Sequence, residues 1–254
     1  MDAEESRHAV RVMRMREGDT LHVTNGCGQM FACRIVTADD RACTVEATGS
    51  PLVCADLERP KLHLAVAPTK NPARMEWLVE KAVEVGVDEI TLLQCDHSER
   101  TFLKTDRLER IALSAMKQSL HTMLPVIHPT VSLRDWLSTF HFPLSSQKFI
   151  AHCEEGQPRL PIATALKPGV DTTVLIGPEG DFSEEEISAA LTHGFQPVSL
   201  GSSRLRTETA ALYAVAAFSM INEGLTPTPD TNPYLDATGI LSSPRERGVD
   251  TAIA

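Results

Sequence analysis

From residue 61 onward, short apolar runs alternate with segments whose apolar residues recur every three or four positions. Lys61–Ala67 and Glu89–Cys95 have the pattern of largely buried strands. Between them, residues 75–83 place apolar side chains at helical spacing, and Gly86 follows as a helix-ending residue. Parallel strands need a helical crossover, so alternating strands and helices are typical of a mainly parallel sheet. The pattern predicts an α/β domain over residues 61–224.

The later elements of this region follow the same alternation. A helix is expected from about residue 108 to 122, and Ser183 with Glu186 forms a capping box that opens another helix. The remaining predictions are strands at Lys148–His152, Thr173–Ile176 and Val198–Leu200, and a long helix with an alanine-rich face at Thr207–Ile221. The Pro-rich tail, residues 225–254, is expected to be disordered because it can bury little apolar surface.

The first 57 residues have a different pattern. Thr20–Thr24 and Gln29–Val36 alternate polar and apolar residues around an Asn25-Gly26 turn signal, which predicts a hairpin. Cys43–Thr48 continues the alternation. Short strands lose their exposed edges by closing on themselves, so a small N-terminal β-barrel is expected.

Charge and composition restrict the partners and the compartment. The formal net charge of −10 argues against non-specific binding to a polyanion, yet Arg7, Arg11, Arg14 and Arg16 place four positive charges within ten residues. This run is either a solvated face or a nucleic-acid contact. The chain has no run of 18 apolar residues and no secretory signal pattern, and its six cysteines are scattered. A cytoplasmic protein with reduced thiols and no membrane span is expected.

Two glycine-containing loops connect predicted strands to predicted helices, at residues 176–183 and 200–210. Loops at the carboxyl ends of parallel strands are where open α/β sheets bind ligands. The chain lacks the dinucleotide-binding, Walker and nucleophile-elbow motifs. Cys95 and His97 have no matching second pair of metal ligands, so no metal site is predicted.

Taken together, the two loops resemble the paired C-terminal motifs of the RsmE family, SPOUT-class methyltransferases that modify N3 of a uridine in 16S ribosomal RNA. The resemblance extends from residue 7 to about 224 and includes Ala67–Trp77, Glu80–Val87, His97–Arg100 and Ala115–Ser119. His8–Asp19 is similar to the opening of the family's PUA-like barrel. Asp181 departs from the family pattern, because many members have a second glycine at that position.

The resemblance implies a SPOUT trefoil knot, formed by threading the chain after Ile176 through a loop. It also implies bound S-adenosylmethionine, an obligate homodimer and an RNA-binding role for residues 1–57. The face of helix 207–221 that carries Ala210, Ala211, Ala214 and Ala217 is either a dimer surface or buried on its own sheet.

The implied reaction needs an activated uracil, because N3 carries a proton at neutral pH. Arg206 is suited to stabilise negative charge on O2 and O4, and Glu208 or Glu179 to remove the proton. Alternatively, Arg206 and Glu208 cap helix ends or pair with each other. The expected cofactor-binding residues are Leu175, Ile176, Gly177, Pro178, Gly180, Leu200, Gly201, Leu205 and Thr209. The expected RNA-binding residues are Arg7, Arg11, Arg14, Arg16, Lys70 and Arg74.

Two other functions remain open. A PUA-type RNA-binding or ribosome-assembly protein could retain this fold without catalysis, although the intact loops at 177–180 and 206–209 argue against it. A SPOUT methyltransferase acting on another RNA would have the same motifs.

Overall fold

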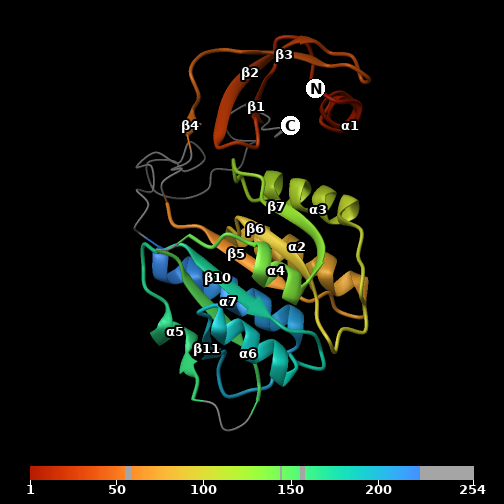
Figure 1. Cartoon of the computed structure of the whole chain (residues 1–254). Helices are drawn as coiled ribbons and strands as arrows, with labels where there is room; N and C mark the ends of the chain where they lie inside the picture. The colour runs from red at the N-terminus through yellow and green to blue at the C-terminus, as the bar shows by residue number, and fades with distance from the viewer. Residues whose placement is uncertain (55–58, 144, 155–157, 224–254) are drawn as a thin grey trace. The chain divides into compact units, whose positions relative to one another are not determined.

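A computed structural model describes residues 1–54, 59–143, 145–154 and 158–223 (Figure 1). The predicted tail at 225–254 lies outside the described residues. Contacts within the chain define two compact units. The first contains the N-terminal region together with residues 116–124, and the second contains most of the remaining described chain. Residues 116–124 belong to the first unit but fall inside the domain predicted at 61–224, so at that point the units differ from the predicted domains.

The N-terminal unit is a small antiparallel sheet preceded by a helical segment. Its strands are β1 (Thr20–Thr24), β2 (Gln29–Thr37), β3 (Thr44–Ala47) and β4 (Val53–Cys54). They pair in the order β1-β2-β3, and β4 also pairs with β2. Among these described strands β1 pairs with neither β3 nor β4. The predicted hairpin is confirmed, and Asn25 stabilises its turn by accepting the backbone N–H groups of Cys27 and Gln29.

The sequence patterns did not predict the helical start. Helix α1 (Ala3–Arg7) begins where the Asp2 side chain accepts the N–H groups of Glu4 and Glu5, and the π-helical η1 (His8–Val12) follows it. These turns bury Ser6 and Ala9, and Ala9 packs with Leu21 and Ile35 of the sheet. The segment is therefore part of the unit's core, while its arginine side chains point to solvent.

The second unit has a parallel sheet that contains seven strands within the described residues. The strand order is β7-β6-β5-β10-β8-β11-β9, and every neighbouring pair is parallel. The strands are β5 (Leu62–Val66), β6 (Glu89–Gln94), β7 (Val126–Ser132), β8 (Gln147–Ala151), β9 (Leu160–Pro161), β10 (Thr172–Ile176) and β11 (Gln196–Ser199). This confirms the predicted α/β fold. The threading of a knot remains a prediction.

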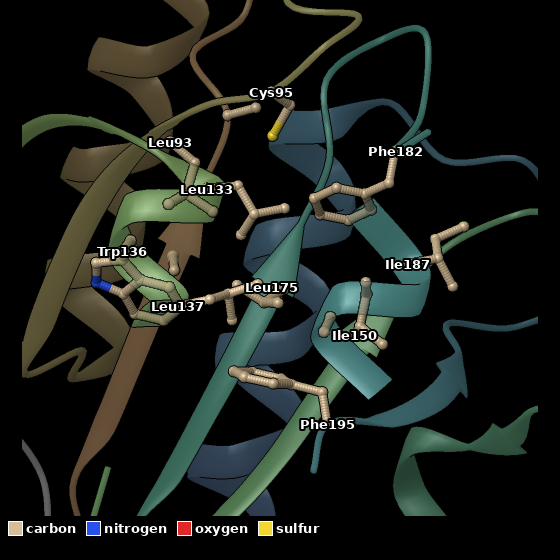
Figure 2. Close-up of a cluster of buried hydrophobic side chains, with 13 residues drawn as sticks. Leu93, Cys95, Leu133, Trp136, Leu137, Ile150, Leu175, Phe182, Ile187 and Phe195 are labelled. Carbon is tan, nitrogen blue, oxygen red and sulfur yellow. The ribbon is translucent and has the colours of Figure 1, made fainter. Parts of the chain in front are cut away.

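The helices of this unit cover both faces of the sheet. They are α2 (Pro72–Val85), α3 (Thr105–Gln118), α4 (Leu133–Thr139), α5 (Ile162–Ala165), α6 (Glu184–Thr192) and α7 (Thr207–Asn222). Helix α7 packs against β5, β10 and α2, whereas α4 and α6 lie on the opposite face (Figures 1 and 2). The predicted capping box is present, with Ser183 and Glu186 each accepting the other's backbone N–H.

The hydrophobic core under α4 and α6 fixes the central strands. Figure 2 shows Leu175 of β10 between Trp136 and Leu137 on one side and Phe182, Ile187 and Phe195 on the other. Strands β5 and β10 are buried at every position. Burial on both faces explains why these strands have continuous apolar sequences, and it holds their carboxyl ends rigidly at one edge of the sheet.

Candidate active site at the carboxyl ends of β8 and β10

A pocket of about 310 Å³ opens where β8 and β10 end and α7 begins. Small-molecule sites in proteins have volumes of about 300–1,000 Å³, so the pocket can hold much of one cofactor-sized ligand. Its lining comes from three separate stretches of the chain: Ala151 and Cys153; Ile176–Glu179 with Asp181; and Arg204–Thr207 with Ala210.

The loop from Gly177 to Ser183, here called the packed loop, is built from close contacts. A Cβ atom on Gly177 would lie 3.0 Å from Cδ2 of the buried Phe182, and one on Gly180 would lie 2.9 Å from Cβ of His97. Real Cβ atoms are essentially never found closer than 3.0 Å, so a side chain at position 180 would displace His97, and one at position 177 would press on the ring of Phe182.

Asp181 adopts a left-handed backbone conformation, with φ 65°. Aspartate tolerates this region better than most residues, and glycine tolerates it best. The Asp181 carboxylate accepts the N–H of Cys153 at 2.7 Å and the N–H of Phe182 at 2.8 Å. This side chain therefore ties the loop to the end of β8, which a glycine could not do.

The loop from Leu200 to Arg206, here called the open loop, is exposed at residues 201–204 and at 206. Gly201 is exposed with φ 101°, and nothing lies within 4 Å of the position of its Cβ. The two loops meet at the start of α7, where the Thr207 hydroxyl donates to the Gly177 carbonyl at 3.1 Å. Leu205 then lines the pocket beside Pro178.

Charged side chains of both signs lie at the pocket. Glu179, Arg204 and Arg206 line it and are exposed. The carboxylate of Glu179 accepts a hydrogen bond from the backbone N–H of Lys70 at 3.0 Å, and this bond orients it. Arg206 is the N-cap residue of α7 and, within the described chain, its side chain makes no capping hydrogen bond. Its guanidinium is therefore available to a ligand at the pocket.

Glu208 lies elsewhere. It is buried in the first turn of α7, and its Oε1 pairs with Nη1 of Arg74 at 3.2 Å. Its Oε2 has no hydrogen-bond partner among the described residues, and Glu208 does not line the pocket. The alternative in which Arg206 pairs with Glu208 is wrong, because the ion-pair partner of Glu208 is Arg74. Arg74, predicted to bind RNA, is thereby held by a buried carboxylate.

The structure collects part of the predicted cofactor set. Ile176, Gly177, Pro178 and Leu205 line the pocket. The other predicted cofactor residues do not line it: Leu175 is buried in β10, Gly180 packs on His97, and Leu200, Gly201 and Thr209 lie beyond the lining.

Sequence reasoning missed two lining residues: Ala151, the last residue of β8, and Cys153, two residues beyond it. The strand itself was predicted, and because parallel strands present their carboxyl ends at one edge, the residues after it could have been included. Next to them, His152 is buried with neither ring nitrogen hydrogen-bonded within the described residues. Burial, with Arg159 nearby, lowers the pKa of His152.

The predicted RNA-binding arginines of the N-terminal unit remain on its surface. Arg7 is exposed at the end of α1, and Arg11 pairs with Asp40. Arg14 and Arg16 line a shallow concavity in the same unit, together with Val10, Met15, Glu17 and Ala38. In the second unit, Lys70 pairs with Glu99 at 2.7 Å.

Comparison with known proteins finds two family models along the chain. A model described as an RNA methyltransferase domain matches residues 57–219, and one described as an RNA methyltransferase PUA domain matches residues 2–48. Among curated relatives, ribosomal RNA small subunit methyltransferase E of Bacillus subtilis is 28% identical over 236 residues, covering 87% of this chain and 89% of the relative.

Solved structures agree with these matches. A protein of Porphyromonas gingivalis described as a "probable rRNA-methyltransferase" is 43% identical with a TM-score of 0.80, and the match covers 87% of this chain and 92% of that one. Lpg2936 of Legionella pneumophila, a putative methyltransferase solved with the cofactor SAM, is 30% identical with a TM-score of 0.73. The match covers 87% of this chain and 91% of that one. Within the described residues, none of the helices is long and apolar enough to cross a membrane.

Proposed function

The chain belongs to the RNA methyltransferase family, and we propose that it transfers a methyl group from S-adenosylmethionine to N3 of a specific uridine in 16S ribosomal RNA. The observation that carries this proposal is the pocket at the carboxyl ends of β8 and β10, which is lined by the two family loops and by Arg206. The B. subtilis relative is named for the small-subunit RNA.

The pocket fits the cofactor on its own chemistry. Residues 176–178 and 204–205 line the cavity, and a side chain at position 177 would press on the ring of Phe182. Polar backbone groups of these residues would hold the adenine and ribose of the cofactor, and the apolar side chains of Ile176 and Leu205 would contact its rings. The bound cofactor supplies a methyl group already activated on a sulfonium. The protein then needs to orient the target nitrogen and to remove its proton.

We propose that Arg206 stabilises the charge that develops on the uracil and that Glu179 removes its N3 proton. The guanidinium of Arg206 would donate to the uracil carbonyl oxygens as negative charge develops on the ring. Glu179 lies in the pocket lining with its carboxylate oriented by Lys70, so it is the better candidate to remove the N3 proton. Glu208 would hold Arg74 and the first turn of α7. Glu179→Gln should therefore lower turnover more than Glu208→Gln does, once both variants are shown to be folded.

RNA would be held by Arg7, Arg11, Arg14 and Arg16 of the N-terminal unit, with Lys70 beside the pocket. Lysine and arginine neutralise phosphates without reading sequence, and unstacked bases carry specificity. We expect Arg11→Ala combined with Arg14→Ala to weaken RNA binding and to flatten its dependence on salt, as measured by filter binding at several salt concentrations. Cofactor affinity should not change, because both arginines lie outside the pocket.

The protein would act in the cytoplasm as a homodimer. The inner side of α7 buries Ala211 and Ala214 within its own unit, so those alanines are not the dimer surface. Tyr213 and Met220 of α7 and Trp77 of α2 are exposed large apolar side chains, and α2 packs on α7. Exposed apolar side chains on two helices that pack together are what a second copy would cover. Sedimentation of Tyr213→Glu combined with Met220→Glu should then give a monomer.

The decisive experiment maps methylated uridine in 16S RNA from a strain lacking the protein. Loss of one N3-methyluridine, restored by the native chain and not by Arg206→Ala, would support the proposal. S-adenosylmethionine binding measured by calorimetry separates the alternatives. A non-catalytic RNA-binding protein would not bind it, whereas a methyltransferase for another RNA would bind it and leave 16S RNA unchanged.

A further inference from the structure

At the opposite end of the sheet from the pocket, three strands bring together the side chains of His63, Glu89 and His128. The parallel register pairs His63 of β5 with Glu89 of β6, and Thr91 of β6 with His128 of β7. Side chains alternate between the faces of a strand, so Glu89 and Thr91 share one face. The register therefore brings all four side chains to the same face near the amino ends of β5, β6 and β7.

The donor atoms of this cluster converge. Glu89 Oε2 lies 3.1 Å from Nε2 of His128 and 3.8 Å from Nδ1 of His63. All three donor atoms lie within 4.8 Å of one another. A metal ion about 2.0–2.2 Å from each nitrogen or oxygen would hold its ligands at separations close to these. Small side-chain adjustments would complete the site.

The surroundings of His63 match those of a metal ligand. Its Nε2 lies 2.7 Å from the hydroxyl of the buried Thr91. When Nε2–H donates to that hydroxyl, Nδ1 carries the lone pair that faces Glu89. Imidazoles that bind metals almost always have their other nitrogen fixed in this way.

Packing closes one side of the cluster and leaves the other accessible. The ring of His63 lies 5.6 Å from that of Trp136 and 5.0 Å from that of Phe140, measured between centroids. The side chains of Glu89 and His128 remain 36% and 38% exposed. An ion could therefore enter from solvent, and a water molecule could complete its coordination.

We propose that His63, Glu89 and His128 bind one divalent transition-metal ion of the zinc class, which joins the edge strand β7 to β6 and β5. Two imidazoles and one carboxylate suit zinc, whereas magnesium and calcium prefer oxygen ligands alone. The site is separate from the carboxyl-end pocket, so the ion is structural and methyl transfer does not depend on it. The sequence predicted no metal because these ligands are spread over 66 residues, from 63 to 128, and only the register unites them.

The test measures Zn²⁺ binding to the full chain after chelator treatment, by competition with a chromophoric chelator. We expect the native chain to bind one equivalent of Zn²⁺ more than the Glu89→Gln variant, the His128→Asn variant or the variant that combines both changes. Zn²⁺ should also raise the thermal midpoint of the native chain and not that of the variants. His141→Asn, which changes an exposed histidine outside the cluster, is the matched control and should bind as the native chain does.

Two further measurements refine the result. Thr91→Val keeps the shape of the side chain and removes the partner of His63, so it should weaken binding by about 10- to 100-fold. Co²⁺ in place of Zn²⁺ should give visible absorption bands in the native chain, and these bands should be absent from Glu89→Gln. Equal stoichiometry in the native chain and the double variant would overturn the proposal, and the cluster would then be a hydrogen-bonded group only.

Discussion

The two loops that meet at the pocket differ in how the rest of the protein holds them. In the packed loop, Gly177 and Gly180 press against Phe182 and His97, and Asp181 bonds to the end of β8. In the open loop, Gly201 has a left-handed backbone and no neighbour within 4 Å of its Cβ position. One wall of the pocket is therefore part of the core, whereas the other depends mainly on its own backbone conformation.

This difference separates stability from ligand binding. A substitution in the packed loop has to displace core atoms, so it should lower the free energy of unfolding. A substitution at Gly201 of the open loop displaces nothing, so it should act on the geometry offered to the ligand. Arg206 is the last residue of the open loop, and its expected role depends on neither effect, because that role is charge stabilisation during the reaction.

The largest expected effect is on turnover, in Arg206→Ala. Removing a donor that stabilises developing charge typically lowers turnover by about 10²–10³. The thermal midpoint and the S-adenosylmethionine affinity should stay close to native values, because the side chain is exposed and makes no capping bond within the described residues. Single-turnover methylation of small ribosomal subunits measures the effect.

Arg204→Ala is the matched control, since Arg204 also lines the pocket and is exposed. If Arg206→Ala retains native turnover while Arg204→Ala loses it, the charge-stabilising role belongs to Arg204. If both variants retain it, neither guanidinium acts on the uracil.

The second effect is on stability, in Gly177→Ala. The new Cβ would lie 3.0–3.1 Å from two ring carbons of Phe182, which is packed in the core under α6. Overpacking of this kind typically costs about 1–3 kcal/mol of unfolding free energy. Chemical denaturation measures it. Gly49→Ala is the control, because nothing lies within 4 Å of that Cβ position. Equal unfolding midpoints for the two variants would contradict a packed loop.

The fold was predictable where local pattern and burial agree. Strands β5 and β10 are buried throughout and appear as apolar runs, and the capping box at Ser183 marks the start of α6. Strand β7 was missed because it is an edge strand that contains Pro129 and alternates weakly in exposure. The helical start at residues 3–12 was missed because its buried face is only Ser6 and Ala9.

The site was predictable only in part, because it depends on contacts between distant segments. The loops were found as strand-to-helix connections, and Arg206 and Glu179 with them. The pairing of Glu208 with Arg74 joins α7 to α2 across the sequence, and no spacing encodes it. The bond from Cys153 to Asp181 is likewise invisible to a sequence pattern, although the departure from glycine at position 181 marked the residue.

The third prediction tests the open loop with Gly201→Val. A left-handed φ costs a residue with a side chain about 1–3 kcal/mol, so the loop should leave its native conformation. The S-adenosylmethionine affinity should fall by roughly 5- to 150-fold, which corresponds to that energy. Gly18→Val is the control, because Gly18 has a similar φ of 94° with nothing near its Cβ position and lies in the N-terminal unit. If both variants bind the cofactor as the native chain does, the open loop is not a wall of its site.

The smallest expected effect is at Asp181, where the packed loop itself uses a left-handed backbone. Asp181→Ala loses the bonds to Cys153 and Phe182 and keeps the unfavourable φ of 65°. Asp181→Gly loses the same bonds and removes the conformational cost, which is about 1–2 kcal/mol. Asp181→Asn keeps an acceptor and tolerates the conformation. The unfolding free energy should therefore decrease in the order Asn, Gly, Ala, as measured by chemical denaturation.

The order of the three variants separates two explanations for aspartate at this position. If hydrogen bonding to the end of β8 alone holds the loop, Gly and Ala should destabilise the protein equally. If the backbone conformation alone matters, Gly should be more stable than the native chain. The structure contains both features, and only their combination places Gly between Asn and Ala. That result would also explain how the loop accepts a glycine here, since glycine keeps the conformation and gives up only the side-chain bonds to Cys153 and Phe182.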